Sequence, residues 1–143
     1  MINIPNACWP TDDVLVGGQP SKDDFIAAKN AGFKTIINVR GHGEDGTDWE
    51  PVFLTELGLD YHHVSVSGPM DITDEKAKLL MDRMEGSARP VMVHCASGNR
   101  VGALFAISAF KRDGASRAEA LEIGSNAGLT KLRPFVEGLL SEA

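Results

Sequence analysis

One short stretch of the chain brings together a nucleophile, a glycine and a strong cation. It reads His94-Cys95-Ala96-Ser97-Gly98-Asn99-Arg100 and lies between two apolar segments, 90–93 and 101–111. The first segment predicts a buried strand and the second a helix, so the stretch between them is expected to be a tight loop. In such a loop, successive backbone N–H groups and the positive end of the helix dipole can surround a tetrahedral anion such as phosphate.

Two side chains of this loop indicate what the anion site would do. The N–H groups of Ala96 to Arg100 that hold an anion would also stabilise Cys95 as a thiolate, which is the nucleophilic form of cysteine. Arg100 closes the loop, where its planar fork can bind two phosphate oxygens and stabilise charge in a transition state. A cysteine taken alone is more often a small core residue. Its combination with Gly98 and Arg100 in a strand-to-helix turn favours a working thiol.

The elements that position this loop alternate along the chain. Apolar segments rich in β-branched residues predict strands over 14–16, 35–39, 61–66 and 90–93. Capping residues and helical apolar spacing predict helices that begin at Ser21, Trp49 and Thr73, and helical pattern also fills the chain from 101 onward. This order predicts one α/β domain over residues 1–143, with a mainly parallel sheet of four to five strands flanked by helices. Such sheets place their sites at the carboxyl ends of the strands.

The composition excludes several other classes of protein. A formal net charge of −6 argues against a nucleic-acid partner, because affinity for nucleic acid depends on clustered Lys and Arg. No apolar run approaches the roughly twenty residues that span a bilayer. Residues 1–5 lack the features of a secretory signal, so a cytoplasmic location is expected. Neighbouring His62 and His63 face opposite sides of a strand and cannot readily chelate one ion, so we expect no metal and no other cofactor.

The loop resembles the phosphate-binding loop of the protein tyrosine phosphatase superfamily, to which dual-specificity phosphatases belong. A wider pattern resembles the beta-lactamase-hydrolase-like family of bacterial phosphatases. It is carried by Gly18-Gln19-Pro20-Ser21, by AGFKTIINVR at 31–40 and by the segment 94–104. The resemblance covers nearly the whole chain and implies a tyrosine-phosphatase-like fold. It also implies hydrolysis of a phosphomonoester through a phosphocysteine intermediate on Cys95.

Two positions depart from the superfamily pattern. Four residues separate Cys95 from Arg100, whereas the usual phosphatase loop has five. Four is also the spacing common in rhodanese-type sulfurtransferases, which carry a persulfide on the cysteine. Val101 stands where the superfamily has a Ser or Thr whose hydroxyl helps the thiolate leave the intermediate. Ser97 could supply a hydroxyl from within the loop, or could simply favour its curl.

The superfamily also uses an aspartate on a neighbouring loop as general acid, and the sequence offers two candidates. Asp71 lies in the Gly- and Pro-containing loop after the third predicted strand and is the first choice, whereas Asp45 follows the second strand and is the alternative. Arg40 ends the second strand and could either contact phosphate or pair with Glu44 or Asp45. The same alternatives, a substrate contact or a structural role, hold for Gln19.

The sequence therefore predicts a cysteine-dependent phosphatase acting on a phosphorylated protein or small molecule, without nucleic-acid or membrane partners. Its proposed catalytic residues are Cys95, Arg100 and Asp71, and its proposed phosphate-binding residues are Ala96, Ser97, Gly98, Asn99 and Arg100. Two alternatives remain open: a rhodanese-like sulfurtransferase that uses a Cys95 persulfide, and a catalytically weak phosphate-binding module. Cys8 is either a spectator thiol or an oxidation partner of Cys95. The sequence does not determine the oligomeric state.

Overall fold

The computed structural model of the chain describes residues 2–44 and 48–141. Five strands form one sheet in the order β1-β2-β5-β3-β4. Strand β1 pairs antiparallel with β2, and all the other pairs are parallel. The mainly parallel sheet predicted from the sequence is therefore confirmed. The strands are β1 (Cys8–Thr11), β2 (Val14–Gly17), β3 (Thr35–Arg40), β4 (Asp60–Val66) and β5 (Val91–His94).

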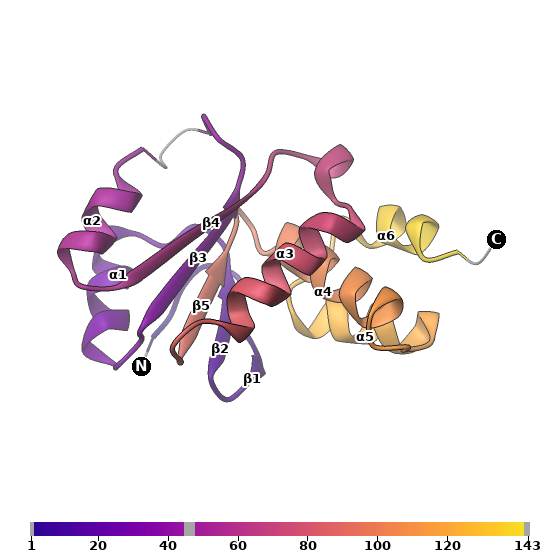
Figure 1. Ribbon diagram of the computed structural model, residues 1–143, viewed down its shortest axis with the longest axis horizontal. Coiled ribbons are helices and arrows are strands. Elements are labelled where there is room, and N and C mark those ends of the chain that lie inside the picture. The colour runs from indigo at the N-terminus through magenta and orange to yellow at the C-terminus, as the bar shows by residue number, and fades with distance from the viewer. Residues whose placement is uncertain (1, 45–47, 142–143) are drawn as a thin grey trace.

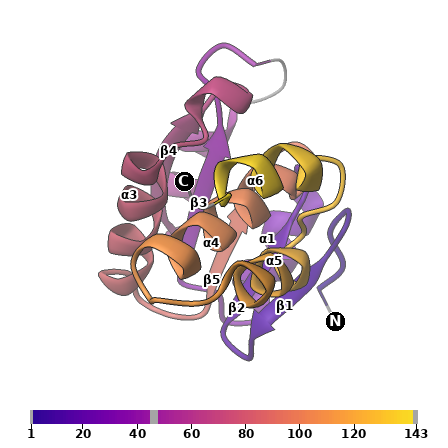
Figure 2. The same cartoon turned by 90° about the vertical axis from the view of Figure 1, so that its right-hand side faces the viewer.

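Helices cover both faces of this sheet (Figure 1). Helices α1 (Lys22–Asn30) and α2 (Glu50–Glu56) lie on one side. A larger group lies on the other side, where α4, α5 and α6 stack against one another (Figure 2). This group consists of α3 (Asp74–Glu85), α4 (Asn99–Lys111), α5 (Arg117–Asn126) and α6 (Arg133–Leu139), and it is preceded by the short 3₁₀ helix η1 (Pro69–Asp71). The α/β class is confirmed.

Local sequence signals set the starts of two of the predicted helices. Ser21 caps α1 and forms a capping box with Asp24, and Thr73 caps α3 by accepting a hydrogen bond from the Lys76 N–H. The prediction of α4 was wrong at its start, since the helix begins at Asn99 rather than at Val101. Arg100 therefore lies in the first turn of the helix. Strand β1 was not predicted, because a four-residue strand at the sheet edge shows only weak alternation.

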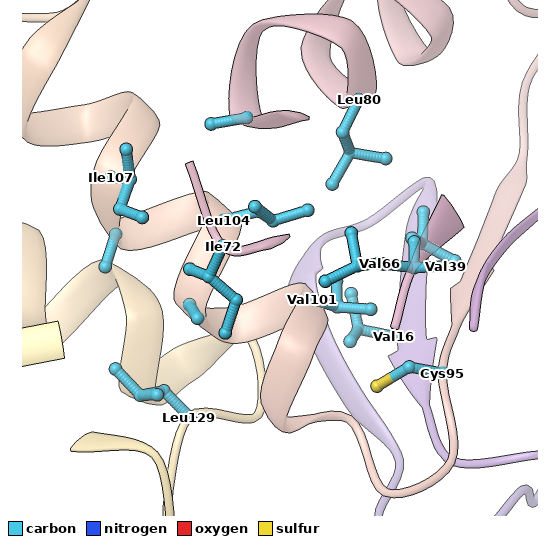
Figure 3. Close-up of a cluster of buried hydrophobic side chains, with 14 of the residues drawn as sticks. Val16, Val39, Val66, Ile72, Leu80, Cys95, Val101, Leu104, Ile107 and Leu129 are labelled. Atoms are coloured by element: carbon cyan, nitrogen blue, oxygen red, sulfur yellow. The ribbon is translucent and has the colours of Figure 1, made fainter. Parts of the chain in front are cut away.

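The two faces of the sheet bury different sets of side chains because strand residues alternate in direction. In β3, Ile37 and Val39 join the large cluster beneath α3 and α4, whereas Ile36 joins a smaller cluster beneath α1 and α2. Figure 3 shows the large cluster with Val101 and Leu104 of α4 packed into it. This packing fixes α4, and hence the loop before it, against the carboxyl end of β5.

The register of the sheet brings the predicted site segments to one edge. Gly17 at the end of β2 pairs with His94, and Asn38 of β3 pairs with the same residue from the other side. Arg40 pairs with Val66 at the end of β4. The segments that follow these strands, including the loop after β5, therefore start close together. Within the described residues, no helix is long and apolar enough to cross a membrane.

Candidate active site

The turn between β5 and α4 places a backbone donor against the cysteine. Cys95 is fully buried, and its sulfur accepts a hydrogen bond of 3.0 Å from the Gly98 N–H. Gly98 has a φ of 92°, in the left-handed region that a residue with a side chain rarely adopts. That conformation turns the N–H back toward the sulfur. The loop backbone thus presents a hydrogen-bond donor to the sulfur.

The segment after β2 forms one wall of this loop. The Gln19 N–H donates to the Ala96 carbonyl at 3.2 Å, and the Asn6 side chain donates to the Ser97 carbonyl at 3.0 Å. A Cβ on Gly18 would lie 2.6 Å from the Ala96 oxygen, so only glycine allows the two segments to approach this closely. The Gly18-Gln19-Pro20 block found in the sequence therefore has a structural reason, which is to support the backbone of the loop between β5 and α4.

Asn99 fixes the loop from the opposite side. Its side-chain oxygen accepts hydrogen bonds from the Thr130 N–H at 2.7 Å and from the Leu132 N–H at 3.1 Å. Its amide donates to the Thr130 hydroxyl at 3.0 Å. The Asn99 side chain therefore binds the connection between α5 and α6, and only its backbone N–H remains for the predicted contact with phosphate.

Arg100 is held by a carboxylate that the sequence analysis did not place in the site. Its Nη1 donates to Glu44 Oε2 at 2.6 Å and to the Val66 carbonyl at 2.7 Å, and its Nη2 donates to Glu44 Oε1 at 3.0 Å. Glu44 also accepts from Arg40 Nε at 3.0 Å and from the Gly41 N–H. One carboxylate thus joins two guanidinium groups at the carboxyl edge of the sheet.

These contacts determine the charge states around the loop. The hydrogen bonds from Arg100, and with them those from Arg40 and Gly41, lower the pKa of Glu44 to about 2, even though partial burial opposes this shift. Glu44 in turn raises the pKa of Arg100, and Cys95 raises it further through its charge and through hydrogen bonding. Arg100 therefore remains a cation next to Cys95, which is the condition that an anion site needs.

An open cleft of about 330 Å³ lies over the first turn of α4. Residues of three segments line it: Ser67, Gly68, Pro69, Ser97, Asn99, Arg100, Lys131 and Leu132. The exposed Lys131 adds a second cation at the rim. A phosphate group could therefore enter between the segment after β4 and the connection between α5 and α6, with Arg100 as its cationic contact.

Of the two candidate acids, the structure describes Asp71 but not Asp45. Asp71 lies at the end of η1, and its carboxylate accepts a hydrogen bond of 3.0 Å from the Ser67 N–H. Ser67 and Pro69 line the cleft, but Asp71 itself does not. To reach a substrate there, Asp71 would have to leave Ser67. Asp45, the alternative, lies outside the described residues, so the choice between the two stays a prediction.

The structure also shows the contacts and burial of the other residues that the sequence analysis considered. Arg40 pairs with Glu44, as one of the two alternatives predicted. Val101, which has no hydroxyl to offer the loop, is fully buried in the large core cluster. Cys8 and Cys95 are both free thiols, and Cys8 is half-buried on β1. Among residues 2–44 and 48–141, no group of three or more potential ligand side chains is placed to hold a metal ion.

Sequence reasoning missed a buried acidic residue next to the loop. Glu50, at the start of α2, is fully buried, and its Oε2 lies 2.7 Å from His94 Nε2. In the sequence it looks like an ordinary acidic residue in the first turn of a helix, where such residues favour the helix dipole. The sequence signal that could have identified it is weak: a Trp precedes it and a Pro follows it in an apolar helix.

Comparison with known proteins places these features in a family context. Residues 8–111 match the family model described as the phosphatase-like domain of the beta-lactamase hydrolase-like protein. All three sequence blocks lie within the matched residues. The chain is similar to the beta-lactamase hydrolase-like protein of Agrobacterium fabrum, with 31% identity over 119 residues, or 80% of this chain and 27% of that protein. The corresponding protein of Xylella fastidiosa is 34% identical over 99 residues, or 66% of this chain and 23% of the relative.

The chain thus spans about a quarter of the length of these curated relatives. Among solved structures, the core catalytic domain of the PP-IP phosphatase SIW14 from S. cerevisiae, in complex with citrate, has a TM-score of 0.73. Its sequence is 18% identical, and the match covers 98% of this chain and 86% of that one. At this identity the two proteins share the fold.

Proposed function

Because the chain belongs to the family of phosphatase-like domains of beta-lactamase hydrolase-like proteins, we propose that it hydrolyses phosphomonoesters with Cys95 as nucleophile. One observation carries this proposal: the Gly98 N–H donates to the Cys95 sulfur at 3.0 Å, in a loop that ends at the cation Arg100. A thiolate, convergent N–H groups and a bidentate cation are the three components that phosphoryl transfer to a cysteine requires.

The proposed reaction has two steps. In the first, the Cys95 thiolate attacks phosphorus, the bond from phosphorus to the ester oxygen breaks, and the departing oxygen takes a proton from a general acid. In the second, water attacks the phosphocysteine, the acid residue takes back a proton, and the thiolate is released with inorganic phosphate. The N–H groups of 96–100 and the Arg100 fork bind the equatorial oxygens in both transition states.

Asp71 remains the proposed general acid. It lies on the segment that lines one side of the cleft, between Pro69 and the first turn of α3. Its carboxylate is held by the hydrogen bond from the Ser67 N–H, and a rearrangement of η1 that breaks this contact would free it to act on a substrate. Ser97 is the proposed hydroxyl of the loop: it is exposed, lines the cleft and accepts a hydrogen bond of 3.3 Å from the Asn99 amide.

We also propose that residues 1–143 act as one catalytic domain. The matched family region ends at Lys111, the last residue of α4. Asn99 is nevertheless bound to Thr130 and Leu132, which lie beyond that region. Lys131, between these two residues, lines the cleft. The C-terminal segment therefore supports the loop and shapes the entrance for a phosphorylated substrate.

A sulfurtransferase is the second candidate, because four residues separate Cys95 from Arg100. The deciding experiment assays one preparation of the full chain for hydrolysis of an aryl phosphate and for transfer of sulfur from thiosulfate to cyanide. We expect phosphatase turnover in the wild type, none in Cys95→Ser, and an unchanged thermal transition in that variant. Sulfur transfer that exceeds phosphate hydrolysis, or hydrolysis that survives Cys95→Ser, would contradict the proposal.

A further inference from the structure

A continuous network of hydrogen bonds between side chains links His94, the residue before Cys95, to Arg100 at the end of the loop. Its inner half begins at His94, whose Nε2 lies 2.7 Å from Glu50 Oε2. Gln19 Nε2 then donates to Glu50 Oε1 at 2.8 Å. Arg40 Nη1 donates to Gln19 Oε1 at 3.0 Å. From Arg40 the hydrogen-bond network continues through Glu44 to Arg100 by the contacts described above.

Gln19 is the link on which the two halves depend. A carboxylate can only accept hydrogen bonds and a guanidinium can only donate them, whereas a side-chain amide does both. The Gln19 NH₂ group therefore donates to Glu50 and also to the Pro20 carbonyl, and its oxygen accepts from Arg40. These partners fix the orientation of the amide. An apolar residue at this position would leave both Glu50 and Arg40 without the partner that joins them.

At the Arg100 end of the hydrogen-bond network, the guanidinium can still bind a substrate. A guanidinium has five N–H groups. Glu44 and the Val66 carbonyl take both N–H groups of Nη1 and one of Nη2. The N–H of Nε and the other N–H of Nη2 are left for Cys95, whose hydrogen bonding also raises the pKa of Arg100, and for the oxygens of a phosphate bound next to that sulfur. Glu44 thus fixes the plane of the guanidinium from one edge and leaves the second edge for the sulfur and the anion.

The side chains of this network come from separate elements. Gln19 follows β2, Arg40 ends β3, and Glu50 begins α2. The network is fully buried at one end, at Glu50 and His94, and becomes more exposed toward the other, where the Arg40 side chain is 12% and the Glu44 side chain 25% exposed. Because such networks are rigid when every member is satisfied, a change at one link should reach the others. No buried side-chain nitrogen or oxygen of the described residues lacks a hydrogen-bond partner.

We propose that Gln19 is a positioning residue, which joins Glu50 to Arg40 and thereby sets the plane in which Arg100 binds phosphate. This inference rests on the proposed phosphatase function and adds to it a residue that has no direct contact with the substrate. It assigns a role to the Gly18-Gln19-Pro20 block beyond the close approach that Gly18 permits. It also predicts that Gln19 and Arg100 are energetically coupled although no direct contact joins them.

The test compares variants of the full chain in an aryl phosphatase assay and in calorimetric binding of inorganic phosphate. Gln19→Met keeps the side-chain volume but interrupts the hydrogen-bond network. We expect kcat/KM to fall about 10- to 100-fold, as for other small misplacements of a catalytic group. Arg40→Met cuts the next link and should give a similar loss. Both variants should also weaken phosphate binding.

Thr35→Val is the matched control. Thr35 is fully buried and donates one hydrogen bond of 2.8 Å to the Ala88 carbonyl, at the opposite end of β3 from Arg40. This variant also loses a buried hydrogen bond, so its thermal transition should fall, but its kcat/KM and its affinity for phosphate should stay at the wild-type values. A merely structural role for Gln19 would make Gln19→Met behave like Thr35→Val.

A double-mutant cycle supplies the decisive result. If Gln19 acts through Arg100, Gln19→Met should lower kcat/KM less than about threefold in an Arg100→Lys background, because the fork that it positions is already absent. An equal loss in both backgrounds would overturn the proposal. Tighter phosphate binding in Gln19→Met would also overturn it, since Glu44 would then be a competitor of the substrate.

The binding measurement separates this inference from the proposed function. If the wild type binds phosphate but has no phosphatase turnover, the function fails, and the dependence of phosphate affinity on Gln19 still decides the inference. If the wild type has turnover and Gln19→Met matches the wild type in both assays, the inference alone fails.

Discussion

The two faces of the sheet meet at the same loop but are built differently. The face under α3, α4 and α5 is apolar, and it supplies the packing that holds the first turn of α4. The face under α1 and α2 has a smaller apolar cluster and also buries the Glu50–His94 pair. Successive residues of one strand and loop belong to the two sides, since His94 points toward α2 and Cys95 packs with the apolar cluster.

This difference separates two tasks. The apolar face places the backbone of the loop, because its side chains can pack closely but have no directional contacts. The polar face orients a charged group, because hydrogen bonds depend on the direction of donor and acceptor. Substitutions on the apolar face should therefore change the unfolding free energy alone, whereas substitutions on the polar face should also change phosphatase activity. Four experiments test this separation.

Removing the buried carboxylate of the polar face should have the largest effect. Glu50→Ala leaves His94 and Gln19 without their common partner in a fully buried position. A buried polar group that loses its hydrogen-bond partner costs about 1–3 kcal/mol of unfolding free energy, and this substitution leaves two such groups. Denaturant titration should show this loss together with reduced phosphatase activity in the protein that remains folded. A loss below about 1 kcal/mol would mean that the polar face contributes little to stability.

A matched substitution on the apolar face should change stability alone. Leu80 of α3 is fully buried in the large cluster and lies outside the segments that line the cleft. Leu80→Ala should lower the unfolding free energy by about 2–5 kcal/mol through lost contacts and the cavity left behind. Below its thermal transition, kcat per folded molecule should match the wild type. A specific loss of kcat would show that packing on this face also tunes the chemistry.

The next experiment tests the general acid, which we place on the segment after β4. Asp71→Asn should slow hydrolysis of an alkyl phosphate by about 10²-fold and should affect an activated aryl phosphate much less, because only a poor leaving group needs a proton. Measurement of kcat/KM for both substrates, in Asp71→Asn and in Asp45→Asn, decides between the two candidates. Asp45 is the acid if its variant alone shows the dependence on the leaving group.

The pH dependence of stability gives the smallest effect. Hydrogen bonds, above all from Arg100, lower the pKa of Glu44 from 4.5 to about 2 in the folded chain. A lowered folded-state pKa stabilises the protein above pH 4.5, and this contribution is lost as the pH falls toward 2. In Glu44→Gln the unfolding free energy should therefore fall less steeply over this interval, by at most about 1.4 kcal/mol per pH unit. Identical slopes in variant and wild type would exclude an ionic Glu44–Arg100 contact.

Much of the fold could be predicted because its signals are local. The apolar run of β3, the capping box at Ser21 and the glycine before α4 act through neighbouring residues, so sequence patterns reveal them. The loop was found for the same reason. The start of α4 was missed by two residues because Asn99 and Arg100 are polar in a helix otherwise recognised by its apolar side chains. The short edge strand β1 had no comparable local signal.

The sequence by itself was enough to predict the type of chemistry, since a cysteine, a glycine and an arginine lie close together in the chain and need no distant residue to form one loop. Only the tertiary structure determined which groups surround that site. Glu44 and Glu50 lie 56 and 44 residues from Arg100 and His94, respectively. They meet at the loop because parallel strands end at one edge of the sheet. A buried charge must find its partners in space, and no local pattern records that requirement.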